Sequence, residues 1–195
     1  MVRGVWIALL VLVSGTVTMV AAQEKKADQG ATNQAASGWT YPVIKGYGDA
    51  WNLPDAEAQP QKGRTYKVLF SLSHPAEKPD EVMPGLDHMA RMFNVFATRG
   101  VPPQNLKVVG VFHGPAASYA AMSNEVYKAK FGVDNPNLRV IQELRAAGVK
   151  LLLCGQALHG LNLNEKDMLP DVKLATSALI VLAMYQNDGY ALMPF

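Results

Sequence analysis

Short apolar runs alternate with segments of helical periodicity along the chain from Tyr66 onward. The runs 66–72 and 106–112 are nearly all apolar, as expected for strands that are covered on both faces of a sheet. A third run, 149–153, leads directly into Cys154. Two later runs are weaker but have the length of ordinary strands. The pattern therefore predicts five strands: 66–72, 106–112, 149–153, 172–178 and 190–193.

Apolar residues with helical spacing fill the segments between these strands. In the first such segment they form one stripe at i, i+3, i+7 and i+10: Leu86, Met89, Phe93 and Phe96. A later segment opens on Asn135 and Pro136, which favour a helix start because Asn caps free amides and Pro is tolerated at the first helical position. The segment ends at Gly148, a residue suited to the turn after a helix. We predict helices over 84–99, 116–131, 135–147 and 179–187, and a helical turn over 156–159.

Strands that alternate with helices imply right-handed crossovers and a mainly parallel sheet. We therefore predict an α/β fold: a single three-layer domain over 65–195, with about five strands and helices on both faces. Within 172–184 the periodicity does not separate a buried strand from a buried helix, so both readings stay open there.

The first 64 residues do not follow this alternation. Residues 1–22 predict a cleaved signal peptide, because Arg3 precedes an apolar run and small residues supply a cleavage site. A membrane anchor is the alternative, which the polar residues within the run disfavour. Residues 23–38 are small and polar, as in a flexible leader, and 39–64 form an aromatic, irregular arm that packs on the domain or on a neighbouring subunit. The expected location is periplasmic or secreted.

Composition and missing motifs exclude several classes of function. A net charge of +2 without a basic cluster argues against nucleic-acid binding, and no later segment suggests a membrane partner after signal cleavage. One cysteine excludes an intramolecular disulfide. The chain lacks a dinucleotide fingerprint, a phosphate loop and the serine hydrolase elbow. The sequence predicts no cofactor and no metal site.

Cys154 is the strongest candidate for chemistry. It follows the third predicted strand, at the sheet edge where open α/β folds place their ligands. Amides of a following helix would favour its thiolate, the form that attacks sulfane sulfur. The opposing interpretation is a buried thiol that behaves as a small hydrophobe. The residue type and its position leave these two interpretations open.

His113 ends the second strand at the same edge and is the second candidate, since it would stabilise a thiolate or deliver a proton. The alternative is a histidine that closes a loop through a hydrogen bond. Other residues at this edge predict a pocket: Ser73, His74, Gly114, Gly155 and Gln156.

Five segments together resemble the DsrE/DsrF-like family, most closely its exported, single-domain branch: 66–72, 108–114, 135–138, 148–156 and 186–190. The resemblance covers 66–195 and implies an α/β fold of about five strands. It also implies homo-oligomers, often trimers or hexamers, and a cysteine after a middle strand that carries persulfide sulfur. Cys154 matches that cysteine.

These observations lead to a first hypothesis and two alternatives. The first is an exported sulfur carrier or sulfurtransferase-like protein that accepts sulfane sulfur on Cys154 and exchanges it with a protein donor or acceptor. The alternative is a non-catalytic, oligomeric module that binds a small ligand while Cys154 only packs. A redox or metal site that combines Cys154 with a histidine ranks last, because no second thiol is present.

Overall fold

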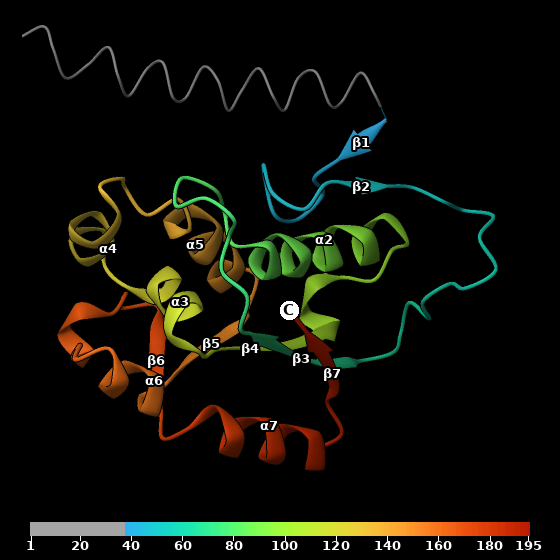
Figure 1. Ribbon diagram of the computed structural model, residues 1–195. Coiled ribbons are helices and arrows are strands. Elements are labelled where there is room, and N and C mark those ends of the chain that lie inside the picture. The colour runs from blue at the N-terminus through green and yellow to red at the C-terminus, as the bar shows by residue number, and fades with distance from the viewer. Residues whose placement is uncertain (1–37) are drawn as a thin grey trace, which may run out of the picture. The chain divides into compact units, whose positions relative to one another are not determined.

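The computed structural model describes residues 38–195, and within them five parallel strands form one sheet (Figure 1). Their order across the sheet is β6-β5-β4-β3-β7, and every neighbouring pair is parallel. The strands are β3 (Tyr66–Leu72), β4 (Leu106–Phe112), β5 (Lys150–Cys154), β6 (Val172–Ala175) and β7 (Ala191–Pro194). The predicted α/β class and the five strands are confirmed.

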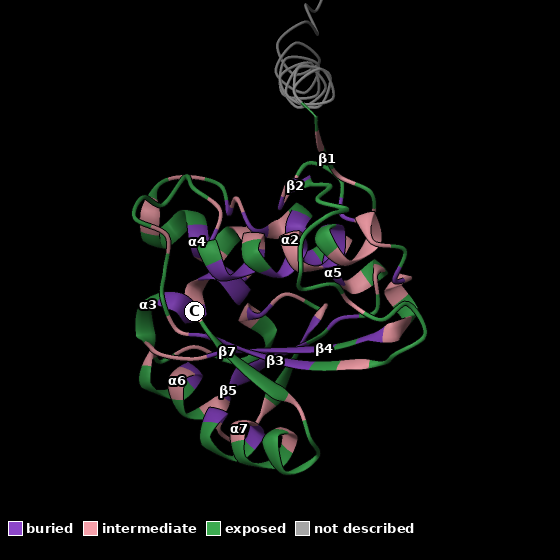
Figure 2. Cartoon of the chain, turned by 90° about the vertical axis from the view of Figure 1, so that its right-hand side faces the viewer, coloured by how far each residue is buried: buried purple, intermediate pink, exposed green. Residues whose placement is uncertain are grey.

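Helices cover both faces of this sheet (Figures 1 and 2). One face carries α2 (Pro84–Thr98), α3 (Pro115–Ser118), α4 (Asn124–Phe131) and α5 (Leu138–Ala146). The other face carries α7 (Ala178–Asn187), and α6 (Gly155–Gly160) directly follows β5. Residues 38–195 also contain three short 3-10 turns: η1 (Pro103–Asn105), η2 (Tyr119–Ala121) and η3 (Glu165–Asp167).

Alternation along the strands divides the core into two apolar clusters. Val68, Phe70 and Leu72 of β3 join the larger cluster beneath α2 and α5. Leu69 of the same strand joins a smaller cluster with Val181 of α7. Because successive side chains of a strand point to opposite faces, the other strands divide in the same way. The same alternation determines which side chains at the carboxyl edge of the sheet lie on the α2 face and which lie on the α7 face.

The predicted continuous helix over 116–131 is wrong. The chain forms α3 and η2, becomes extended at Met122, and starts α4 after Ser123. Met122 forms an antiparallel bridge with Met168, and the Ser123 N–H donates to the Asp167 carbonyl at 2.8 Å. The Ser123 hydroxyl then accepts from the Val126 N–H and caps α4. A long-range contact therefore overrides the local helical pattern.

Two further boundaries differ from the prediction by a few residues. Helix α5 begins at Leu138, because the Asn135 side chain accepts from the Asn137 N–H in the turn before it. Strand β6 ends at Ala175, and Ser177 caps α7 by accepting from the Leu179 N–H. Helix α7 therefore begins one residue before the predicted helix.

The segment 39–64 contains a small antiparallel ladder between β1 (Trp39–Thr40) and β2 (Ala50–Trp51). The loop 43–48 between these strands packs on α2, where the buried Asn94 amide hydrogen-bonds five of its backbone groups. Gly48 approaches α2 so closely that a Cβ there would lie 2.0 Å from the Arg91 backbone nitrogen. The arm is thus fixed to its own domain over these residues.

The predicted signal over 1–22 lies outside the described residues, as does all of the predicted leader except Gly38. Among helices of the described part, none combines the length and the apolar character that crossing a bilayer requires.

Candidate functional site

Cys154 is the last residue of β5 and the N-cap residue of α6. Its side chain lies in the smaller apolar cluster with Val111, Ala178 and Val181, and 6% of the residue is exposed. Within residues 38–195 its thiol makes no hydrogen bond, including none to the amides of α6. The sulfur therefore lies at the predicted edge of the sheet, and helix α7 largely covers it.

His113 directly follows β4, and Cys154 ends the neighbouring strand β5. The β4–β5 ladder ends with Phe112 opposite Leu153, and His113 and Cys154 are the residues that follow this last pair. Neighbouring strands lie about 4.8 Å apart, and both residues continue the face that points to α7. The His113 ring, however, turns to the other neighbour: its Nε2 lies 2.7 Å from the Ser71 hydroxyl of β3.

The His113 ring is held in its neutral form. Burial lowers its pKa below the usual value of 6.5, and the nearby His74 lowers that pKa further by charge repulsion. At pH 7 the imidazole is therefore neutral and able to accept a proton. Because the unfolded chain binds this proton more readily, the neutral ring favours the folded state above about pH 6.5, and that contribution is lost as the pH falls.

The remaining residues of the predicted pocket lie around the same edge. Ser73 donates its hydroxyl to the Phe195 carbonyl at 3.2 Å and contacts His74 Nδ1 at the same distance. Gly114 has a φ of +79°, which lets the chain turn from β4 into α3. Gln156 is exposed, and its amide donates to the Thr176 carbonyl.

The two other histidines stand apart from this group. His88 stacks on Phe195 and bonds the Pro84 carbonyl, whereas His159 is exposed on α6. In the described part of the chain, no three side chains of His, Cys, Asp or Glu gather closely enough to hold a metal ion.

A sequence model of the DsrE/DsrF-like family matches residues 67–195, which contain the five-stranded sheet except Tyr66 and both candidate residues. The chain belongs to the DsrE/DsrF-like family. Among solved structures, MTH1491, a protein of unknown function from Methanobacterium thermoautotrophicum, is 17% identical with a TM-score of 0.49, and the match covers 67% of this chain and 99% of that one. The ychN protein from E. coli is 16% identical with a TM-score of 0.46, covering 67% and 100%. No curated protein matches the sequence.

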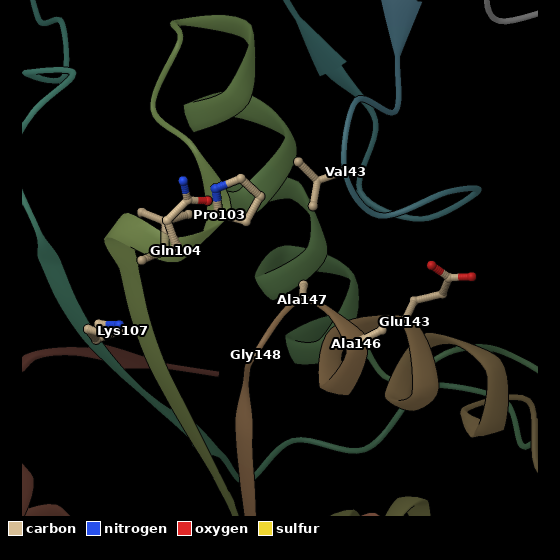
Figure 3. Close-up of a pocket in the computed structure, with 9 residues that line it drawn as sticks. Val43, Pro103, Gln104, Lys107, Glu143, Ala146, Ala147 and Gly148 are labelled. Carbon is tan, nitrogen blue, oxygen red and sulfur yellow. The ribbon is translucent and has the colours of Figure 1, made fainter.

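Hollows lie at opposite edges of the sheet of this DsrE/DsrF-like domain. The larger, about 590 Å³, opens at the amino ends of β4 and β5, where Lys107 and Glu143 lie on its two sides (Figure 3). The smaller, about 200 Å³, lies at the carboxyl edge between the loop after β3 and α3–α4, with Met83, Ala117 and Tyr127 among its walls. Neither hollow is lined by Cys154 or His113.

Ser71 is the site residue that the sequence analysis of this DsrE/DsrF-like chain missed. It is the only polar residue in the run from Val68 to Leu72, and 9% of it is exposed. A lone hydroxyl within an apolar strand needs a partner, because an unpaired polar group in the core is costly. That argument indicates a buried hydrogen bond, but naming His113 as the partner also requires the order of the strands.

Proposed function

We propose that this protein is an exported sulfur carrier, on which Cys154 accepts sulfane sulfur as a persulfide. The observation that carries the proposal is the position of the thiol: Cys154 ends a central strand at the carboxyl edge of the sheet, and His113 directly follows the neighbouring strand β4 at the same edge. Membership of the DsrE/DsrF-like family supports the same reading. Export follows from the signal predicted over 1–22 and is part of the proposal.

The proposed chemistry needs only one thiolate and a sulfane donor such as thiosulfate. The Cys154 thiol gives its proton to a base, and His113, whose pKa is lowered by burial, is the proposed acceptor at this edge of the sheet. The thiolate attacks the outer sulfur of thiosulfate, the sulfur–sulfur bond of thiosulfate breaks, and sulfite leaves with the electron pair. An acceptor thiolate then attacks the outer sulfur of the persulfide and releases Cys154 as a thiolate. Each step exchanges one sulfur–sulfur bond for another, so no oxidant is required.

Intact-mass measurement tests this proposal. After incubation with thiosulfate or polysulfide, the wild-type protein is expected to gain about 32 Da, the mass of one sulfur atom, and to lose it on reduction. Cys154→Ser is expected to gain nothing, because the chain has no other thiol. Equal labelling of the two proteins, or labelling of neither, would contradict the proposal.

The burial of Cys154 favours a second candidate function, a small-ligand-binding module in which this thiol only packs. Its contacts with Val111, Ala178 and Val181 are those of a small hydrophobic side chain. The hollow of about 200 Å³ at the carboxyl edge would then take a small, mostly apolar ligand between Met83, Ala117 and Tyr127.

Thiol alkylation separates the two functions. A carrier requires that Cys154 react with iodoacetamide in the folded protein, since sulfur donors must reach the same atom. A packing residue is expected to react only after unfolding in guanidinium chloride. The alkylation rate of the folded protein, divided by that of the unfolded chain, measures how accessible Cys154 is. A ratio indistinguishable from zero would reject the sulfur-carrier function and leave the binding module as the remaining candidate.

We further propose that the protein is a homo-oligomer, a trimer or hexamer, in which α7 lies between copies. The helix has no charged side chain, and its residues from Ala178 to Met184 are all apolar. Leu179 is 78% exposed, and Ile180, Ala183 and Met184 extend the same uncovered face. A helix that is apolar all round is normally buried, which supports burial of this face in an assembly.

A further inference from the structure

Three lysines from adjacent strands lie on one face of the sheet, near its amino edge. Lys67 of β3 pairs with Lys107 of β4, and Lys150 of β5 pairs with Val109, two residues further along β4. The residue two positions after each lysine belongs to the apolar cluster that α7 covers. Because side chains alternate along a strand, the three lysines lie on this α7 face as well, where they form the lysine surface. They are about forty residues apart in the chain, so no local run of charge marks them.

The lysine surface has little opposite charge beside it. All three side chains are exposed, and within residues 38–195 none of them lies within 4.0 Å of a carboxylate. Asp188 follows α7, which itself carries no charged side chain, and Glu143 lies across the hollow from Lys107 (Figure 3). Like charges that face each other on neighbouring strands destabilise a sheet, so the needs of the fold do not explain Lys67 opposite Lys107.

Two of the lysines make contacts within the domain that leave their charge uncompensated. Lys67 donates to the carbonyl at the C-terminal end of α7 at 2.9 Å, and its Nζ lies 5.7 Å from the centre of the Tyr190 ring. The Nζ of Lys150 lies 5.6 Å from the centre of the Tyr185 ring. A carbonyl and an aromatic ring carry no net charge, so they orient these ammonium groups without neutralising them. Lys107 makes no such contact within the described residues.

The tyrosines beside the lysine surface disfavour single-stranded nucleic acid as its ligand. Tyr185 and Tyr190 pack edge to face, with ring centres 4.9 Å apart, and a lysine lies over each ring. Aromatic residues bind single strands by stacking on the bases, and these contacts occupy the ring surfaces that stacking would use.

The position of the apolar residues disfavours a membrane. Leu179, the most exposed large apolar residue of α7, lies in its first turn, whereas the lysine surface adjoins the other end of the helix through the bond of Lys67. Interfacial binding needs basic and apolar groups that enter the same level of the lipid surface. Three lysines alone attract anionic lipid only weakly.

We infer that the lysine surface binds an acidic, extended segment of a partner protein. From the spacing and rise of parallel strands, the backbones of Lys67 and Lys107 are about 5 Å apart and those of Lys107 and Lys150 about 8 Å apart. Carboxylates on alternate residues of an extended chain are about 7 Å apart, so successive ones can pair with these lysines. Such contacts favour fast, salt-dependent association. The inference goes beyond the proposed function and does not involve Cys154.

Fluorescence anisotropy with a fluorescein-labelled octaglutamate peptide and the full-length protein tests this inference. The wild type is expected to bind the peptide at about 10 mM salt and to release it at about 1 M, where the Debye length falls to about 3 Å. Lys107→Gln combined with Lys150→Gln is expected to weaken this binding about fivefold, because two exposed ion pairs are lost. This variant keeps the bond from Lys67 to the end of α7.

Lys130→Gln combined with Lys166→Gln is the matched control, because it removes the same charge from exposed positions elsewhere. Lys130 also lies over a tyrosine ring, that of Tyr119, at 5.5 Å. The control is expected to bind the peptide as the wild type does. Equal weakening in the two variants would show that the peptide responds only to net charge and would overturn the inference, as would a wild type that does not bind the peptide.

Two further measurements complete the test. Tighter binding of oligothymidine, or of vesicles of phosphatidylglycerol and phosphatidylcholine, than of the peptide would assign the lysine surface to nucleic acid or to a membrane instead. The urea midpoint of the Lys107 and Lys150 variant is expected to equal or exceed that of the wild type, because the substitutions relieve like-charge repulsion. A lowered midpoint would show that these lysines serve the fold and would also overturn the inference.

Discussion

Asn94→Ala is expected to lower the free energy of unfolding by about 3 to 5 kcal/mol, because each buried polar group that loses its partner costs about 1 to 3 kcal/mol. The Asn94 side chain is fully buried on α2. Its oxygen accepts from the Val43 and Ile44 N–H groups at 2.8 and 2.9 Å. Its nitrogen donates to the carbonyls of Ile44, Tyr47 and Gly48 at 2.8 to 3.1 Å. The measurement is urea denaturation followed by circular dichroism.

Asn52→Ala is the control for this variant, since it removes an amide from the same arm. Asn52 is exposed and accepts a single bond from Arg99 at 2.7 Å, so its loss is expected to cost less than about 1 kcal/mol. Equal effects of the two substitutions would show that Asn94 does not fix the arm. In Asn94→Ala the arm is also expected to become sensitive to proteolysis between 43 and 48, because its backbone loses its anchor on α2.

Leu179→Lys combined with Met184→Lys is expected to convert the proposed oligomer into a monomer, with the mass of a single chain. Both side chains are already exposed on the single chain, so the new charges leave its core untouched. In an assembly they would place unpaired ammonium groups in an apolar interface, and burying such groups costs several kcal/mol per copy. Light scattering coupled to gel filtration measures the mass, and far-ultraviolet circular dichroism checks the fold.

Gln186→Lys combined with Asn187→Lys gives the matched control, with the same added charge on exposed polar positions of α7. Lysine is also favourable in the last turn of a helix, so this variant is expected to fold and to keep the mass of the wild type. A wild-type protein that is monomeric at micromolar concentration would reject the oligomer outright. If the variant with lysine at positions 179 and 184 keeps the oligomeric mass, the interface between copies does not include this face of α7.

The architecture could be predicted from the sequence because its central strands, β3, β4 and β5, are largely buried on both faces. The runs 66–72 and 106–112 are buried over their last five residues, so their apolar composition located β3 and β4. The break at Met122 could not be predicted in this way. It depends on a bridge to Met168, forty-six positions later, and no local pattern carries information about that contact.

The sequence predicted the position of single site residues at the sheet edge, but it did not predict which of these residues contact one another. Cys154 and His113 each follow an apolar run, so both could be assigned to the carboxyl edge. Their neighbours depend on the strand order, which places β4 between β5 and β3. Because β3 lies next to β4 in this order, the Ser71 hydroxyl can reach the His113 ring. The local sequence shows Ser71 only as a single hydroxyl in an apolar run. The same limit applies to Asn94, whose partners lie about fifty residues earlier in the chain.

Strand β7 forms the edge of the sheet and pairs with β3. Next to it, the Phe195 carbonyl accepts a hydrogen bond from the Ser73 hydroxyl, 122 residues earlier in the chain. Contacts of such high sequence separation form late and slowly, because the entropy of closing a long loop must be overcome before they contribute. The carboxyl edge would therefore take its final form only after the rest of the sheet has assembled. Refolding experiments are expected to find secondary structure recovered before the environment of the His113 ring becomes native.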